Sequence, residues 1–257
     1  MTIELYITKQ CNFRCPHCIE MCNYIQDPAE DMSIEDVNNI INQINSLAVA
    51  SKRVRLIGGE PTLHPKFLEI CKLLKDGINN CYRFDITSNF TNNELLDTAR
   101  KLYGFETINI YGSRDPNANA KAKLSGHYSI LISPKDAGRY RRDPYGCQGL
   151  TDVCGMCVKK HNGQLAWAWC TWGFTVCRLL GNERYLYASL KELVRSRFND
   201  FAIDICSHCS RLGYGRNNDG VVSGCFVEGL NRIKDRARGM PMHQLHPAFQ
   251  EAAKCRT

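Results

Sequence analysis

Apolar residues in the first 110 positions alternate between two spacings, one typical of strands and one typical of helices. Short stretches rich in β-branched and aromatic side chains predict strands. Between them, apolar residues recur about every 3.6 positions, which predicts amphipathic helices. In the helix expected after Ser33, these positions are Ile34, Val37, Ile40, Ile41, Ile44 and Leu47.

The same patterns place further elements along the chain. Strands are expected at "IELYIT", "RVRLIGGEP", "CYRFDITSNF", "FETINIYGS" and "HYSILISPKD". Ser33 is a plausible N-cap for the first helix. The helices "PKFLEICKLLKDG" and "NNELLDTARKLYG" each end at a glycine, Gly77 and Gly104.

This alternation predicts an α/β fold with parallel strands and helices packed outside, as a partial (β/α) barrel. Active sites in such folds gather at the carboxyl ends of the strands. Three polar or cysteine-rich segments directly follow strands and should therefore meet at one edge of the sheet.

The sequence changes character after about residue 145, where cysteine, glycine and aromatic residues become frequent. "CVKKHNGQLAWAWC" predicts a hairpin that turns at Asn162-Gly163, and "ASLKELVRSRF" predicts a helix. We therefore expect a barrel core at 1–140 and a small cysteine-rich domain of a β-hairpin plus a helix at 141–230. A basic tail is expected at 231–257.

Composition indicates the compartment in which the protein acts and the role of its cysteines. The chain has 257 residues, a net charge of +7 and 15 cysteines. It contains no apolar run of about 18 residues, so no transmembrane helix is expected. Its first residues lack the features of a signal peptide, so we expect a cytoplasmic protein. Cysteines in a reducing compartment favour metal or cluster ligation over disulfides.

Three of these cysteines, Cys11, Cys15 and Cys18, have the spacing Cys-x3-Cys-x2-Cys directly after the first strand. Three thiolates can hold a [4Fe–4S] cluster with one iron left open. A structural zinc site completed by His17 or Cys22 is the alternative. The motif resembles the signature of the radical S-adenosylmethionine (radical SAM) superfamily, in which His17 would take the position that contacts the adenine.

A second motif supports the resemblance. "GGEP" ends the second strand, where the family binds the methionyl end of SAM. Gly58 and Gly59 let the backbone approach the cofactor, and Glu60 offers a carboxylate to its ammonium group. "TSN" ends the third strand, where Ser88 and Asn89 are candidates to hold the ribose. The resemblance thus implies a SAM-binding [4Fe–4S] cluster, SAM and a reducing protein such as flavodoxin or ferredoxin.

A second set of cysteines follows the barrel region. This set resembles the twitch extension, a shortened SPASM domain that carries an auxiliary [4Fe–4S] cluster. A four-cysteine zinc ribbon and a second auxiliary cluster are the alternatives. The implied ligands are Cys154, Cys170, Cys206 and Cys209, with Cys157 as an alternative to Cys154.

Length and layout most resemble the aminocyclitol dehydrogenase branch of the family. We therefore expect an oxidoreductase that acts on a sugar, cyclitol or nucleoside. Arg139, Arg141 and Arg142 are candidates to hold the substrate, with a solvated basic loop as the simpler interpretation. The alternative function is modification of a ribosomal peptide or a tRNA, since the basic tail slightly favours RNA.

Overall fold

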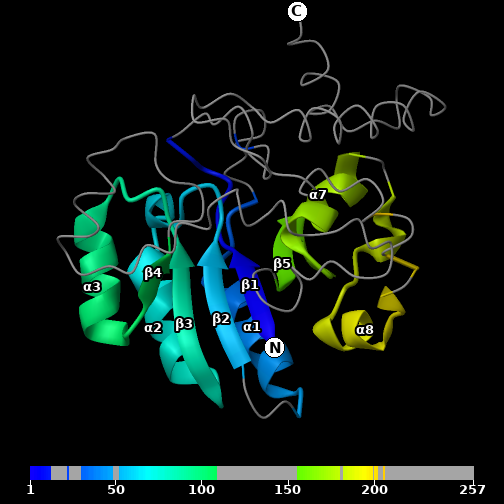
Figure 1. Cartoon of the computed structure of the whole chain (residues 1–257), viewed down its shortest axis with the longest axis horizontal. Coiled ribbons are helices and arrows are strands. Elements are labelled where there is room, and N and C mark those ends of the chain that lie inside the picture. The colour runs from blue at the N-terminus through cyan, green and yellow to red at the C-terminus, as the bar shows by residue number, and fades with distance from the viewer. Residues whose placement is uncertain are drawn as a thin grey trace, which may run out of the picture.

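A six-stranded sheet, in the order β4-β3-β2-β1-β5-β6, forms the centre of the fold (Figure 1). The computed structural model describes residues 1–12, 22, 30–48, 52–108, 155–179, 182–198, 200–201 and 205. The strands are β1 (Thr2–Tyr6), β2 (Lys52–Ile57), β3 (Cys81–Thr87), β4 (Glu106–Ile108), β5 (Met156–His161) and β6 (Gln164–Ala168). The helices are α1 (Ile34–Asn45), α2 (Phe67–Gly77), α3 (Asn93–Tyr103), α7 (Thr171–Leu179) and α8 (Leu190–Arg195), with short 3-10 helices at Pro61–Leu63 (η2) and Glu183–Tyr185 (η3).

The sheet is mixed, because β1 to β5 pair in parallel and β6 runs antiparallel to β5. The α/β class predicted from the sequence is therefore confirmed, and the open, curved sheet is consistent with part of a barrel. In Figure 1, α1 and α2 lie behind the sheet. The fifth predicted strand, at "HYSILISPKD", lies outside the described residues.

The local sequence explains where α1 begins and where α3 ends. Ser33 caps α1 through a capping box with Asp36. Gly104 ends α3 in the left-handed conformation, with φ of 70°. The faces of α1 to α3 bury aliphatic residues against one face of the sheet, to which β1 contributes Ile3 and Leu5.

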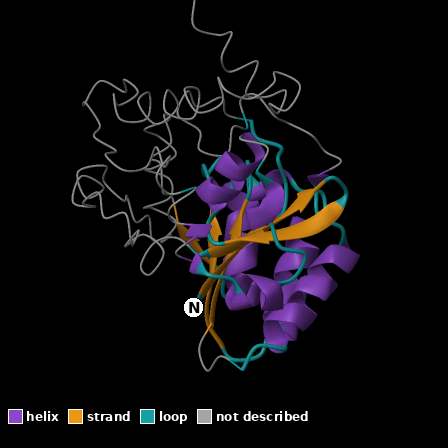
Figure 2. Cartoon of the chain, turned by 90° about the vertical axis from the view of Figure 1, so that its right-hand side faces the viewer, coloured by secondary structure: helices purple, strands orange, loops and turns teal. Residues whose placement is uncertain are grey.

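The hairpin of β5 and β6 extends the same sheet, and Figure 2 shows the twist between it and the strands behind it. The turn residues Asn162 and Gly163 both have positive φ, as a two-residue hairpin requires. Trp167 is fully buried and belongs to the same core as Leu190 and Leu193 of α8. The predicted hairpin is confirmed.

Helix α7 covers the opposite face of the hairpin and was not expected from the sequence. Its buried Phe174 packs against Cys157, Ala166 and Ala168. The segment "TWGFTVCRL" is rich in aromatic, β-branched and glycine residues, which are weak helix formers. Tertiary packing therefore overrides local propensity here.

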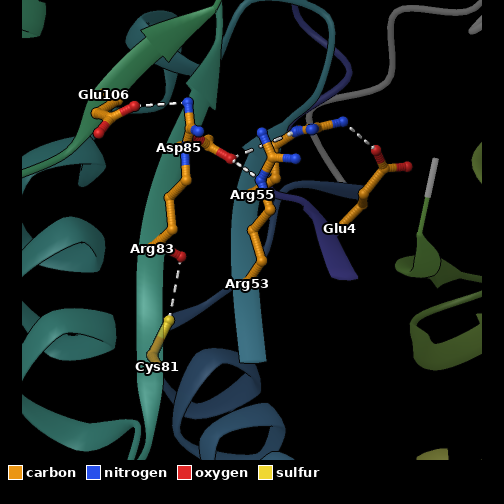
Figure 3. Close-up of polar contacts among 7 residues, drawn as sticks. All are labelled: Glu4, Arg53, Arg55, Cys81, Arg83, Asp85 and Glu106. Atoms are coloured by element: carbon orange, nitrogen blue, oxygen red, sulfur yellow. Dashed lines mark hydrogen bonds and ion pairs between the residues drawn. The ribbon is translucent and has the colours of Figure 1, made fainter. Parts of the chain in front are cut away.

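Charged side chains line the face of β1 to β4 that α1 to α3 do not cover (Figure 3). The fully buried Asp85 accepts hydrogen bonds from Arg53 and Arg83, and Arg55 Nε lies 3.9 Å from it. Arg55 also donates to Glu4 at 2.9 Å. These contacts join three neighbouring parallel strands. None of the helices in the described part of the chain is long and apolar enough to span a membrane.

Candidate functional site

The segments that leave β1 and β2 dock directly on each other. The Gly59 amide donates to Thr8 O at 2.8 Å, and the Glu60 amide donates to Gln10 O at 2.7 Å. A Cβ on Gly58 would lie 2.6 Å from Thr8 O, and one on Gly59 would overlap Gln10 O. Glycine is therefore required at both positions, because the chain leading to Cys11 lies against their backbone.

Glu60 is the centre of a buried hydrogen-bond network. Its Oε1 accepts from the amide and hydroxyl of Thr62, at 3.1 and 2.7 Å. Its Oε2 accepts from the Asn89 amide at 2.7 Å, and the Ser88 hydroxyl lies 3.0 Å from both oxygens. Burial raises the pKa of Glu60 above its ordinary value, although these donors oppose the shift.

Asn89 connects the end of β3 to the cysteine-bearing segment. Its Nδ2 donates to Asn12 Oδ1 at 2.9 Å, and its Oδ1 accepts from the Thr91 amide at 3.1 Å. Since Asn12 directly follows Cys11, the structure brings Cys11, Glu60, Ser88 and Asn89 to one edge of the sheet. This is the edge at which the sequence predicted them to meet.

Cys11 itself is partly exposed and packs against a small apolar cluster of Tyr6, Cys22 and Ile57. The Cys22 thiol is buried, 3.2 Å from the Tyr6 hydroxyl. The predicted partners Cys15, His17 and Cys18 lie outside the described residues. Among the residues that are described, no three His, Cys, Asp or Glu side chains converge as a metal site.

Two observations at this edge are compatible with an iron–sulfur cluster and a nucleotide cofactor. Cys11 supplies a thiolate of the kind that iron–sulfur clusters bind. Thr87 Oγ1, at the carboxyl end of β3, is buried and has no hydrogen-bond partner within the described part of the protein. An unsatisfied buried hydroxyl indicates a missing polar partner, as a nucleotide ligand would supply.

Two of the predicted auxiliary ligands are described, and they differ in surroundings. Cys157 is fully buried in the apolar cluster under α7, with Ala166, Ala168 and Phe174. Cys170 is partly exposed at the start of α7, where its Sγ accepts from the Gly173 amide at 3.1 Å.

The chain that leads toward Cys206 returns to Cys170. A Cβ on Gly173 would overlap the ring of Phe201 and lie 3.0 Å from Cys170 Sγ. The Ile205 amide donates to Phe201 O at 2.8 Å, which turns the chain just before Cys206. Cys154, Cys206 and Cys209 lie outside the described residues, as do Arg139, Arg141 and Arg142.

Sequence reasoning missed several groups near the first cysteine. Thr62 binds Glu60 from the 3-10 turn that follows it, and Pro61 at the start of that turn was the signal in the sequence. Lys9 pairs with Glu30, which also pairs with Arg178 of α7. Burial lowers the pKa of Lys9 to about 8, and Arg178 adds to this effect while Glu30 opposes it. No local pattern links residues 148 positions apart.

Parts of this chain are similar to known proteins. Residues 5–111 match the family model described as Radical SAM superfamily. The probable GTP 3',8-cyclase of Pyrococcus horikoshii is 29% identical over 129 residues, which are 50% of this chain and 39% of that protein. GTP 3',8-cyclase 3 of Mycobacterium tuberculosis is 27% identical over 135 residues, 50% of this chain and 35% of the relative. The matched part thus spans well under half the length of these relatives.

A solved structure shares the fold. The crystal structure of BtrN in complex with AdoMet and 2-DOIA superposes with a TM-score of 0.54 and 17% identity, covering 86% of this chain and 94% of that one. At this identity, the likeness concerns the fold alone. The family model matches residues 5–111, which are under half of the chain, so this part of the chain is similar to the radical SAM superfamily.

Proposed function

We propose that this protein is a radical SAM oxidoreductase that oxidises a small polar molecule, such as a sugar, cyclitol or nucleoside. The observation that carries the proposal is the meeting of three strand exits at one edge of the sheet. The segment around Cys11, the Gly58–Glu60 turn and the Ser88–Asn89 turn are joined there by direct hydrogen bonds.

Each part of this edge has a role in the proposal. Cys11, Cys15 and Cys18 would hold the cluster. The backbone at Gly58 and Gly59 and the charge of Glu60 would receive the methionyl end of SAM, and Thr87, Ser88 and Asn89 lie where sugar hydroxyls could bind. His17 would contact the adenine. When bound, the cluster and SAM supply a 5′-deoxyadenosyl radical that takes a hydrogen atom from the substrate.

The second cysteine set would hold an auxiliary [4Fe–4S] cluster through Cys154, Cys170, Cys206 and Cys209. The packing of the Phe201 ring against Gly173 supports this grouping, because it brings the chain before Cys206 close to Cys170. The apolar burial of Cys157 favours Cys154 as the first ligand.

The proposed reaction balances as a two-electron oxidation. The substrate loses a hydrogen atom to the 5′ carbon, then one proton to a base or solvent and one electron to the auxiliary cluster. An external reductant such as flavodoxin or ferredoxin supplies one electron for each SAM that is cleaved. Names of the sequence relatives refer to GTP, which keeps nucleotides among the candidate substrates.

A labelled substrate tests the proposal. The protein is reconstituted without oxygen and incubated with a reductant, SAM and candidate substrates that carry deuterium at the carbinol carbon. We expect one deuterated 5′-deoxyadenosine for each oxidised product, and about eight irons per chain for two cubanes. Product without 5′-deoxyadenosine, or zinc in place of iron, would refute the proposal.

A further inference from the structure

A buried carboxylate connects the two cysteine-bearing parts of the chain. Glu30 accepts two hydrogen bonds from the Arg178 guanidinium, both at 3.1 Å, and forms an ion pair with Lys9. The three side chains are only 4–11% exposed. A two-pronged guanidinium contact fixes direction as well as distance, so Glu30 is held in one orientation.

On one side, the contact reaches the segment that leads to Cys11. Lys9 lies two residues before that cysteine, and Gln10 donates to Asp31, the neighbour of Glu30, at 2.7 Å. The backbone of the same segment accepts the amides of Gly59 and Glu60. A displacement of Glu30 would therefore move the docking partner of Gly59 and Glu60.

On the other side, the contact reaches α7, which directly follows Cys170. The amino end of this helix, opposite Arg178, is also anchored, because the Thr171 hydroxyl donates to Glu4 at 2.6 Å. Lys159 donates to Thr171 O at 3.2 Å and places its ammonium 4.4 Å from the Tyr6 ring centre. Helix α7 thus runs from a contact with β1 near Cys170 to a contact with Glu30 near Lys9.

We infer that Glu30 is a positioning residue for SAM binding. It holds the Lys9–Cys11 segment, and through it the Gly59–Glu60 backbone, in the arrangement set by α7. The identity of the ligand rests on the proposed function, whereas the positioning of Gly59 and Glu60 does not. Because the ion pairs are buried, removal of one partner leaves an uncompensated charge and shifts the backbone that carries it.

Two variants and a matched control test this inference. Glu30→Gln removes the charge and one of the two acceptor oxygens, and Arg178→Met removes both donors. Lys160→Met removes a different ion pair, between the hairpin and α1. SAM affinity is measured by the change in the electron paramagnetic resonance spectrum of the reduced cluster. We expect about tenfold weaker SAM binding in Glu30→Gln and Arg178→Met, and less than a twofold change in Lys160→Met.

Hydrogen exchange provides a readout that needs no cofactor. In both Glu30→Gln and Arg178→Met, the amides of Gly59 and Glu60 should exchange about ten times faster, while Lys160→Met leaves them protected. Unchanged exchange in folded variants would overturn the inference even if SAM binds. If the wild-type protein binds no cluster, but the amides of Gly59 and Glu60 exchange faster in both variants, the proposed function is overturned and the positioning role of Glu30 stands.

Discussion

At the scale of single residues, the hydrogen bonds of Glu60 decide how the candidate site is organised. The sequence placed a carboxylate at a strand end and assigned it to the cofactor's ammonium group. The structure shows that both oxygens already accept from Thr62, Ser88 and Asn89. Glu60 therefore joins the ends of β2 and β3 and also places a buried carboxylate at the edge where SAM is proposed to bind.

A neutral isostere tests this dual role. In Glu60→Gln, the amide NH2 must face the backbone N–H of either Thr62 or Asn89, so two donors oppose each other. We expect a loss of about 1–3 kcal/mol in the free energy of unfolding and weaker SAM binding. Urea unfolding and a SAM titration measure the two effects. The exposed Glu69→Gln on α2 is the control, and equal effects in the two variants would contradict the role of Glu60.

The sequence identified the candidate residues of the site, but not their hydrogen-bond partners. Local spacing identified Cys11, Gly58, Gly59 and Glu60 because each follows a strand. It did not show that Ser88 binds Glu60 or that Asn89 reaches Asn12, since those contacts depend on how neighbouring strands align. Glu30 and Arg178 carried no local signal at all.

At the scale of elements, apolar periodicity predicted most strands and helices correctly, because one face of each element is buried in a common core. It did not predict α7, whose helical state depends on packing over the hairpin. The alternation of charged and apolar residues in "RVR" and "RFD" was visible in the sequence. The pairing of Arg53, Arg55 and Arg83 with Asp85 was not, because it depends on strand register.

The charged layer formed by Arg53, Arg55, Arg83 and Asp85 predicts that Asp85 contributes strongly to the free energy of unfolding. In Asp85→Ala, three guanidinium groups lose their shared carboxylate in a buried position. We expect the free energy of unfolding to fall by about 3–5 kcal/mol. Denaturant unfolding measures the loss, with the exposed Asp76→Ala on α2 as control. A change of under about 1 kcal/mol in Asp85→Ala would show that the layer contributes little to stability.

The contact between α1 and the hairpin predicts a dependence on pH. Burial alone would raise the pKa of Asp36, but hydrogen bonds from Ser33 and Lys160 outweigh it and hold the pKa below its ordinary value of 3.8. The stabilisation is therefore complete above about pH 4 and is lost as the pH falls through the lower folded-state value.

Lys160→Met should remove part of that stabilisation at pH 7, by at most about 1 kcal/mol, and should have a smaller effect at about pH 3, where part of the stabilisation is already lost. Urea unfolding at both pH values measures the difference. Lys72→Met, which removes an exposed pair on α2, is the control. An equal loss at both pH values would mean that Lys160 acts through packing and not through its charge.

At the scale of the whole molecule, the hairpin and the first strands belong to one sheet, and α7 extends across them. Thr171 and Arg178, near its two ends, are about 10 Å apart along the helix axis. Thr171, which directly follows Cys170, donates a hydrogen bond to Glu4. Arg178 donates to Glu30, which lies next to the segment that leads to Cys11. The order of elements was predictable from sequence, whereas this connection between the two cysteine-bearing segments required the tertiary structure.

Electron–nuclear double resonance can detect whether SAM binds the open iron of the proposed cluster. The reduced protein is combined with SAM that carries ¹⁵N in the methionyl amine and ¹³C in the carboxylate. We predict hyperfine couplings from both labels to the cluster, and their loss in Cys11→Ala. A reduced cluster that shows neither coupling at saturating SAM would mean that every iron is already ligated by the protein, and would contradict the proposed binding of SAM to the open iron.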